Sequence, residues 1–219
     1  MDRTEPELVV ADDTAAEALR LFLQLAPRTI VLSGGSTPEA FYRLLATTGY
    51  DWPGVELFFG DERCVPADDA RSNLGMVRRA LADHVPARTY PIDGAACDAD
   101  GYEGRLRERF AGASVPAFDL AIYGLGPDGH TASLFPGRPA VEETERWVVR
   151  VPEAGLEPFV PRVTLTVPAL SSAAVGAFLV EGATKREMVA RLLAGDDIPA
   201  ARLSPARLVV IADPAAAGR

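Results

Sequence analysis

The chain has 219 residues, of which 48% are hydrophobic and 24% are charged, and both fractions are ordinary for a globular domain. No segment approaches the roughly 20 consecutive apolar residues that cross a bilayer, which excludes a membrane-spanning protein, and we expect no membrane partner. With 22 Lys and Arg residues against 31 Asp and Glu residues, the net charge is −9, and this charge opposes binding to nucleic acid. An anionic ligand would therefore need a local group of basic residues.

We expect one domain over residues 1–219, because the short Gly, Pro and Asp clusters fit turns rather than a linker. The expected assembly is a monomer or a weak homodimer. Residues 1–13 contain acidic residues early and lack the apolar run of a secretory signal, so we expect a cytoplasmic protein. Cys64 and Cys97 are too few and too far apart in sequence for a disulfide framework, and we expect both to be reduced, buried or idle thiols.

Apolar runs of strand length recur along the chain between longer segments of helical periodicity. Several runs are apolar almost throughout, which is typical of strands buried on both faces in a parallel sheet. The predicted fold class is therefore α/β, with a mainly parallel sheet. The predicted strands are Leu8–Ala11, Thr29–Leu32, Val55–Phe59, Phe118–Tyr123, Trp147–Val151, Val163–Val167, Val175–Val180 and Leu208–Ala212.

Three segments between these runs are expected to be helical. Thr14–Leu25 places its apolar residues on one stripe, and Asn73–His84 has similar spacing, with Asn73 as its expected N-cap. A further helix is expected over Glu39–Ala46. The longest irregular stretch, Pro136–Glu145, follows the most unusual motif in the chain and is a candidate active-site rim.

The first chemical motif runs from Ser33 to Pro38, directly after a predicted strand and at the start of a helical segment. Its glycines let the backbone turn tightly and present N–H groups, and a helix N-terminus adds partial positive charge. The residues that would cradle a phosphate are Gly34, Gly35, Ser36 and Thr37. An ordinary strand-to-helix turn with a Ser or Thr cap is the alternative.

The second motif, Asp61-Glu62-Arg63, ends an apolar strand abruptly. Ligands in open α/β sheets bind beyond the carboxyl ends of strands, so these charges fall where a site would form. The alternative is a solvated loop.

The third motif extends from Gly124 to Pro136 and contains His130, one of only two histidines. An imidazole titrates near neutral pH, so His130 beside Asp128 can serve as a general base or acid, with the carboxylate fixing its tautomer. A structural histidine in a turn is the alternative. We interpret the other histidine, His84, as a surface or capping residue.

Two cations complete the set. Arg162 stands at the head of a predicted strand, and Lys185 where another strand passes into a helix. Arg offers a bidentate fork to a phosphate and Lys a point charge, although either one alone is also compatible with a surface cation.

Together, the strings SGGSTP, GDER, SNLGMVRRAL, GLGPDGHTASLFP, PRVTLT and GATK resemble the 6-phosphogluconolactonase family over most of the chain. This resemblance implies a three-layer α/β/α fold with a Rossmann-like sheet, shared with glucosamine-6-phosphate deaminases and ribose-5-phosphate isomerases. It also implies the hydrolysis of a phosphosugar lactone without a metal or other cofactor.

By the same resemblance, His130 is the general base, and Asp61 and Asp128 orient the imidazole or the water. Which of the two carboxylates is the closer partner of His130 stays open. Arg63 faces the substrate, and it or backbone N–H groups stabilise the oxyanion. The residues implied to hold the 6-phosphate are Gly34, Gly35, Ser36, Thr37, Arg162 and Lys185.

Two alternative functions fit parts of the sequence less well. An amino-sugar phosphate deaminase would continue the His130 motif with Ile-Ala-Phe-Asn-Glu-Pro, whereas this chain has Thr-Ala-Ser-Leu-Phe-Pro. A sugar-phosphate sensor would need an output module, and no helix-turn-helix segment precedes Leu8. One departure from the family is Glu153–Val160, which lacks a Lys and Pro run, so a rim contact to the substrate is expected to differ.

Overall fold

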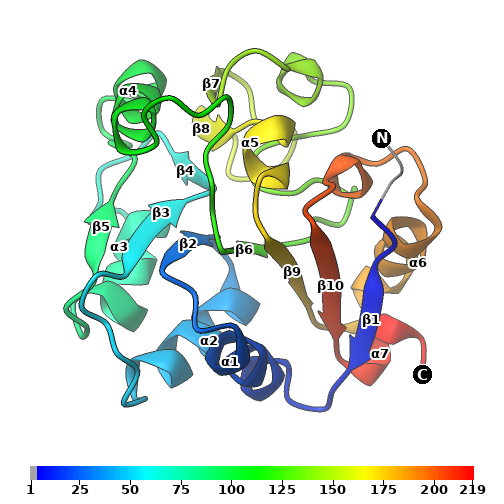
Figure 1. The fold of residues 1–219 in the computed structure, drawn as a ribbon. Helices are drawn as coiled ribbons and strands as arrows, with labels where there is room; N and C mark the ends of the chain where they lie inside the picture. Colours follow the sequence, from blue (N-terminus) through cyan, green and yellow to red (C-terminus); the bar gives the residue numbers. More distant parts are fainter. Residues whose placement is uncertain (1–3) are drawn as a thin grey trace.

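A seven-stranded sheet runs through the middle of the computed structural model, which describes residues 4–219 (Figure 1). Every pair of neighbouring strands in it is parallel. Seven strands form the sheet in the order β1 (Glu7–Val10), β10 (Arg207–Ala212), β9 (Val175–Val180), β6 (Leu120–Tyr123), β2 (Thr29–Leu32), β3 (Glu56–Phe59) and β5 (Arg88–Tyr90).

The central strands are buried along their whole length because helices cover the sheet. Each residue of β2, β3, β6 and β9 is buried, as expected for apolar runs that are covered on both faces. The flanking helices are α1 (Thr14–Leu25), α2 (Ser36–Ala46), α4 (Ala99–Arg109), α6 (Arg186–Ala194) and α7 (Pro214–Ala217). The predicted α/β class with its helix-flanked, mainly parallel sheet is confirmed. No helix within residues 4–219 is long and apolar enough to cross a membrane.

A second, antiparallel sheet stands apart from the first and consists of β4 (Asp61–Arg63), β8 (Arg162–Leu165) and β7 (Val148–Val151). The sequence predicted the last two as strands without assigning either one to a sheet. Short apolar runs look alike in either kind of sheet, so the sequence pattern cannot assign a strand to one of them. The run that starts at Val163 also ends early, because Pro168 opens the short helix α5 (Val167–Ser171).

Two helix boundaries differ from the expected ones. The segment expected as one helix over Asn73–His84 is α3 (Asn73–Val77) followed by a π-helical turn, η1 (Arg78–Ala82). Its N-cap is Ser72, whose hydroxyl accepts from Gly75 N at 3.0 Å, and not Asn73. The helix expected from Glu39 begins three residues earlier, at Ser36, because Pro38 is compatible with a first helical turn.

Residues 4–219 also contain three short 3-10 turns: η2 (Pro139–Glu142), inside the stretch predicted to be irregular, η3 (Ala183–Lys185) and η4 (Pro199–Arg202).

The order in which the chain adds strands to the sheet reverses between the parallel neighbours β2 and β6. From β2 the connection leads to β3 on one side, whereas from β6 it leads, through the smaller sheet, to β9 on the other side. A crevice opens at such a switch point, beyond the carboxyl ends of the two strands. The loops after Leu32 and Tyr123 border this crevice, and both contain sequence motifs.

Candidate active site

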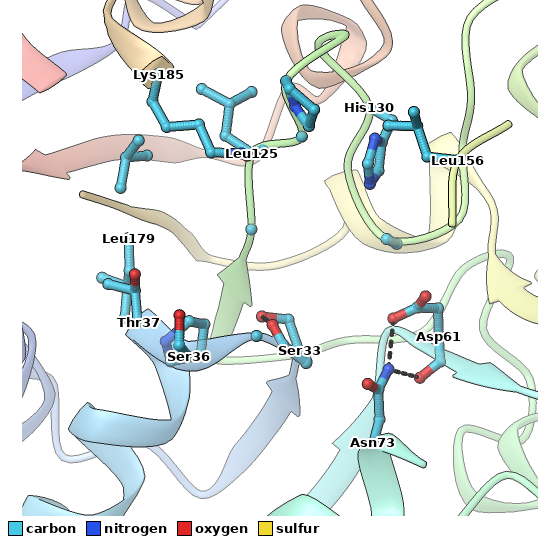
Figure 2. A pocket seen from close by; sticks show the side chains of 18 of the residues that line it. Ser33, Ser36, Thr37, Asp61, Asn73, Leu125, His130, Leu156, Leu179 and Lys185 are labelled. Atoms are coloured by element: carbon cyan, nitrogen blue, oxygen red, sulfur yellow. Dashed lines mark hydrogen bonds between the residues drawn. The ribbon is translucent and has the colours of Figure 1, made fainter. Parts of the chain in front are cut away.

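A pocket of about 260 Å³ lies at this switch point (Figure 2). Segments from β2, β4, β6, β8 and β9 reach it, so residues far apart in sequence come together there. Of the residues predicted for the site, it is lined by Gly34, Gly35, Ser36, Thr37, Asp61, Arg63, His130, Arg162 and Lys185. Asp128 is the exception, because it lies beside His130 without lining the cavity.

Asp128 is the partner of His130. Its Oδ1 atom lies 2.5 Å from Nδ1 of the imidazole and also accepts from the backbone N–H of His130 at 3.1 Å. This leaves Nε2 as the ring nitrogen without that partner. A Cβ on Gly126 would lie 2.0 Å from Nδ1, so only glycine lets the loop close around the ring. Gly129, between Asp128 and His130, has φ +82°, a left-handed conformation that favours glycine.

Asp61 has different partners. It is 5% exposed, and its Oδ2 accepts from the Ser133 hydroxyl at 2.6 Å, while its Oδ1 accepts from Asn73 Nδ2 at 3.0 Å. Figure 2 shows the amide of Asn73 pointing at both the side chain and the backbone oxygen of Asp61. The structure therefore brings both predicted aspartates to the site, with only Asp128 in contact with His130.

Glu62, between these charged residues, serves the fold. Its carboxylate accepts from the N–H groups of Asn73 and Leu74 at 2.8 and 2.7 Å and from the Ser72 hydroxyl at 2.9 Å. Burial raises the pKa of this carboxyl above its usual range, and these hydrogen bonds oppose that rise. Because successive strand residues point to opposite sides, Asp61 and Arg63 line the pocket while Glu62 anchors the start of α3.

Arg63 and Arg162 are direct neighbours across the β4–β8 pair. Arg162 is 4% exposed, and its Nη2 and Nε atoms donate to the carbonyls of Pro158 and Val160 at 2.9 and 3.2 Å. Burial lowers the pKa of Arg162, whereas the charge of Asp61 raises it. Arg63 donates from Nη1 to a backbone carbonyl at 2.5 Å, but its buried Nε has no partner within residues 4–219.

The loop from Gly34 to Thr37 opens α2 without a side-chain cap. Gly35 is the N-cap, with φ +108°, a conformation that favours glycine. The first N–H groups of the helix therefore face the pocket unpaired by any side-chain cap, as an anion site requires. Gly34 is close to Asn73, whose Oδ1 would be 2.0 Å from a Cβ at that position.

Lys185 reaches the pocket from the turn after β9. Its Nζ donates to the Leu125 carbonyl at 2.7 Å, which joins it to the loop that carries His130 (Figure 2). Burial lowers the pKa of Lys185, and the nearby charge of Asp128 opposes this shift. An anion bound beside it would favour the charged ammonium.

The sequence predicted no role in the site for Asn73, Ser133 and Glu181, all of which contact predicted site residues. Ser133 and Asn73 fall inside the strings GLGPDGHTASLFP and SNLGMVRRAL, which is the one signal that could have found them. Glu181 directly follows the buried strand β9, a position that favours a site residue.

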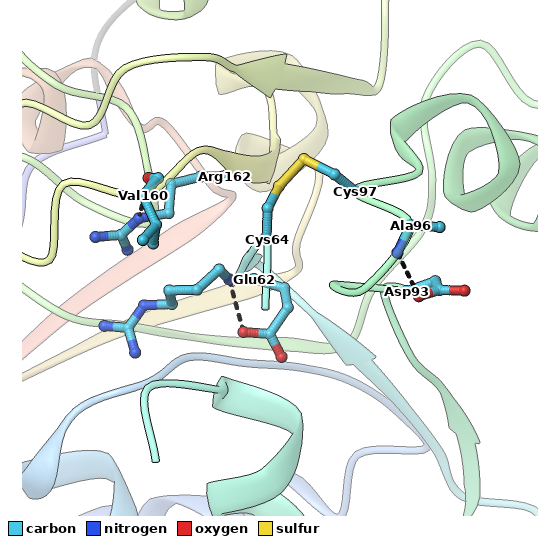
Figure 3. Close-up of a disulfide and its surroundings, with 8 residues drawn as sticks. Glu62, Cys64, Asp93, Ala96, Cys97, Val160 and Arg162 are labelled. Atoms are coloured by element: carbon cyan, nitrogen blue, oxygen red, sulfur yellow. Dashed lines mark hydrogen bonds between the residues drawn. A yellow bond between two sulfur atoms is a disulfide. The ribbon is translucent and has the colours of Figure 1, made fainter. Parts of the chain in front are cut away.

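The cysteines contradict the sequence expectation. Cys64 and Cys97 form a disulfide with a Cα–Cα distance of 4.8 Å, so the prediction of two reduced thiols is wrong (Figure 3). The bond joins the residue after Arg63 to the loop before α4. That loop packs tightly, since a Cβ on Gly94 would lie 2.5 Å from the Arg63 carbonyl. Residues 33 positions apart meet here because of the fold, which their spacing cannot reveal.

An open parallel sheet with an uncapped helix N-terminus, several cations and a His–Asp pair at its carboxyl edge has the architecture of an α/β enzyme. Residues 3–212 match the family described as glucosamine-6-phosphate isomerases/6-phosphogluconolactonase. The chain belongs to this family, as its motifs predict.

Curated relatives and solved structures agree with this membership. The chain is 39% identical over 190 residues to a 6-phosphogluconolactonase of Synechocystis, covering 83% of this chain and 77% of the relative. It is 38% identical to the rat 6-phosphogluconolactonase, covering 80% and 72% of the two chains. The 6-phosphogluconolactonase structure from Trypanosoma cruzi superposes with a TM-score of 0.88 at 29% identity and covers 100% and 98%. A monomeric glucosamine-6-phosphate deaminase has the same fold, with a TM-score of 0.80 at 21% identity and coverage of 97% and 99%.

Proposed function

We propose that this protein hydrolyses 6-phospho-D-glucono-1,5-lactone to 6-phospho-D-gluconate in the oxidative pentose phosphate pathway. The observation that carries the proposal is the His130–Asp128 pair, 2.5 Å apart, at the same pocket as the uncapped N-terminus of α2. A base and an anion cradle in one cavity suit a substrate that has a phosphate at one end and an electrophilic carbonyl at the other.

The phosphate is assigned to the loop Gly34–Thr37 and to Lys185. Backbone N–H groups at a helix N-terminus bind anions through hydrogen bonds and through the helix dipole. Lys185 adds a full charge, which is needed in a protein whose net charge is −9. Arg162 adds a second charge: its Nε and Nη2 atoms are engaged by carbonyls, which leaves Nη1 for the ligand.

His130 acts as the general base. With its Nδ1 proton held by Asp128, the free Nε2 accepts a proton from water as that water attacks the lactone carbonyl carbon. The tetrahedral intermediate then collapses, the bond between this carbon and the ring oxygen breaks, and the imidazolium returns its proton to the leaving oxygen. The products are a carboxylic acid, which ionises, and a free hydroxyl.

Arg63 is assigned to the developing oxyanion. Its buried Nε–H has no partner among the described residues, and a buried unpaired donor is costly unless a ligand uses it. Asp61, fixed by Ser133 and Asn73, lies beside these cations and orients the site without touching His130.

We also propose that the protein acts in the cytoplasm as a monomer or weak homodimer. The Cys64–Cys97 disulfide argues against this location, because disulfides are rare in reducing compartments. The location is tested by counting free thiols after rapid alkylation of cells. Two free thiols per chain agree with the cytoplasm, whereas the absence of free thiols contradicts that location.

The test of the proposed reaction follows acid release from freshly prepared 6-phosphoglucono-1,5-lactone. We expect the wild type to exceed the spontaneous rate many-fold and His130→Ala to lose about 10²-fold or more in kcat. His84→Ala is the matched control, since His84 is exposed, lies outside the pocket and pairs with a backbone carbonyl. A wild type that is no faster than the spontaneous reaction would overturn the proposal. Equal losses in both variants would remove the base role of His130.

A further inference from the structure

A carboxylate borders the loop assigned to the phosphate. Glu181 follows the last residue of β9 and lines the pocket. Its Oε2 accepts from the Thr37 hydroxyl at 3.3 Å, and its Oε1 accepts from the Thr14 hydroxyl at 2.5 Å. An acidic side chain is unexpected next to a cradle built for an anion.

No cation within residues 4–219 neutralises this carboxylate, because none of the ion pairs formed there includes Glu181. Lys185, four residues later, donates to the Leu125 carbonyl instead. Glu181 is exposed, so water screens its negative charge, but no ion pair within the described residues offsets that charge at the pocket.

Resting on the proposed function, we infer that Glu181 is a specificity-determining residue that weakens the binding of phosphorylated ligands. Two physical effects act in this direction. Thr37 has a single hydroxyl proton, so it can donate to a phosphate oxygen only by giving up its bond to Glu181. The Glu181 charge, one hydroxyl away from that phosphate, also repels a dianion through Coulomb interaction.

The effect is greater for the product than for the substrate. Hydrolysis turns the dianionic lactone into an acid with one further negative charge. A fixed carboxylate at the pocket opposes the trianion more than the dianion, so Glu181 favours product release.

Glu181 also has contacts that a purely structural role would explain, since its two oxygens join the first turns of α1 and α2. The variant Glu181→Gln separates the two roles. Gln keeps an oxygen that accepts from a Thr hydroxyl but has no charge. Glu108→Gln is the matched control: Glu108 is exposed on α4, outside the pocket, and loses the same charge.

The experiment is isothermal titration of wild type, Glu181→Gln and Glu108→Gln with 6-phosphogluconate and, separately, with inorganic phosphate. We expect Glu181→Gln to bind both about fivefold more tightly, with the larger gain for 6-phosphogluconate, and Glu108→Gln to match the wild type. The gain should shrink in 1 M NaCl, where the Debye length falls to about 3 Å, and the KM for unphosphorylated glucono-1,5-lactone should not change. A purely structural role would not produce this salt dependence.

Each outcome bears on the role of Glu181 separately from the proposed reaction. Equal or weaker binding by Glu181→Gln overturns the role of Glu181, and the proposed lactonase activity then stands or falls on its own assay. Tighter phosphate binding by Glu181→Gln supports that role even if the lactone is not hydrolysed. A wild type that binds neither phosphate nor 6-phosphogluconate overturns the role of Glu181, while acid release from the lactone still decides the proposed reaction.

Discussion

Asp128 Oδ1 and His130 Nδ1 lie 2.5 Å apart, two residues from each other in one loop, and this contact fixes the orientation of the imidazole. Asp61, the other carboxylate expected near His130, has both of its oxygens occupied by Ser133 and Asn73. The two aspartates therefore have separate tasks, and substitutions distinguish them.

Asp128→Asn should lower kcat by about 10²-fold or more with little change in the unfolding midpoint. An amide can donate to Nδ1 and stabilise the wrong tautomer, which would place the proton on Nε2 and remove the base. The measurement is kcat by acid release, with circular dichroism to confirm folding. Nearly full activity in Asp128→Asn, combined with an inactive Asp61→Asn, would show that the roles are reversed.

Gly34→Ala should raise KM about tenfold, because the new Cβ would lie 2.0 Å from Asn73 Oδ1 and push the phosphate loop aside. Removing the obstacle in the double variant Gly34→Ala/Asn73→Ala should restore part of this loss, so the two changes should be non-additive. Gly49→Ala is the control, since a Cβ there meets nothing within 4 Å. Strict additivity of the two changes would contradict the contact.

Binding of 6-phosphogluconate should weaken with rising pH from a point below pH 10.5, the ordinary pKa of lysine. Burial lowers the pKa of Lys185, so its ammonium loses its proton, and with it the attraction for phosphate, earlier than an exposed lysine would. Calorimetric titration between pH 7 and 10.5 measures the change, and Lys185→Arg should keep its affinity over this range. A dissociation constant that is flat to pH 10.5 in the wild type contradicts the assignment of Lys185 to the phosphate.

Reduction of the Cys64–Cys97 bond should lower the free energy of unfolding by about 2–4 kcal/mol, as expected for a loop with a sequence separation of 33. Urea unfolding with and without dithiothreitol measures this difference. The variant Cys64→Ser/Cys97→Ser is the control, because the reductant should leave its stability unchanged. Identical curves for the oxidised and reduced wild type would refute a stabilising bond.

The sequence predicted most of the main sheet because its central strands are apolar on both faces, and runs such as Thr29–Leu32 and Val175–Val180 match the observed strands residue for residue. It predicted strands near Val148–Val151 and Arg162–Leu165 but could not assign them to a second sheet, because these two strands carry a similar apolar signal. The short strand Asp61–Arg63 is polar throughout and is held by pairing with Arg162–Leu165, a partner about a hundred positions away.

The site, like the fold, was predicted only in part from the sequence. Residues with distinctive chemistry, such as His130 and Lys185, were found from type and position and do line the pocket. Asn73 and Ser133 were missed because an amide or a hydroxyl gains a role only from its partner, here Asp61, and that partner is known only from the fold. The prediction of two reduced cysteines was wrong for the same reason, because only the fold brings Cys64 and Cys97 together.

The proposed activity is tested most sharply by assaying one preparation of the wild-type protein with fresh 6-phosphoglucono-1,5-lactone and, in parallel, with glucosamine 6-phosphate. We expect lactone hydrolysis far above the spontaneous rate and no release of ammonia from the amino sugar. Ammonia release without accelerated lactone hydrolysis would contradict the proposed activity and would assign the chain to the deaminase branch of its family.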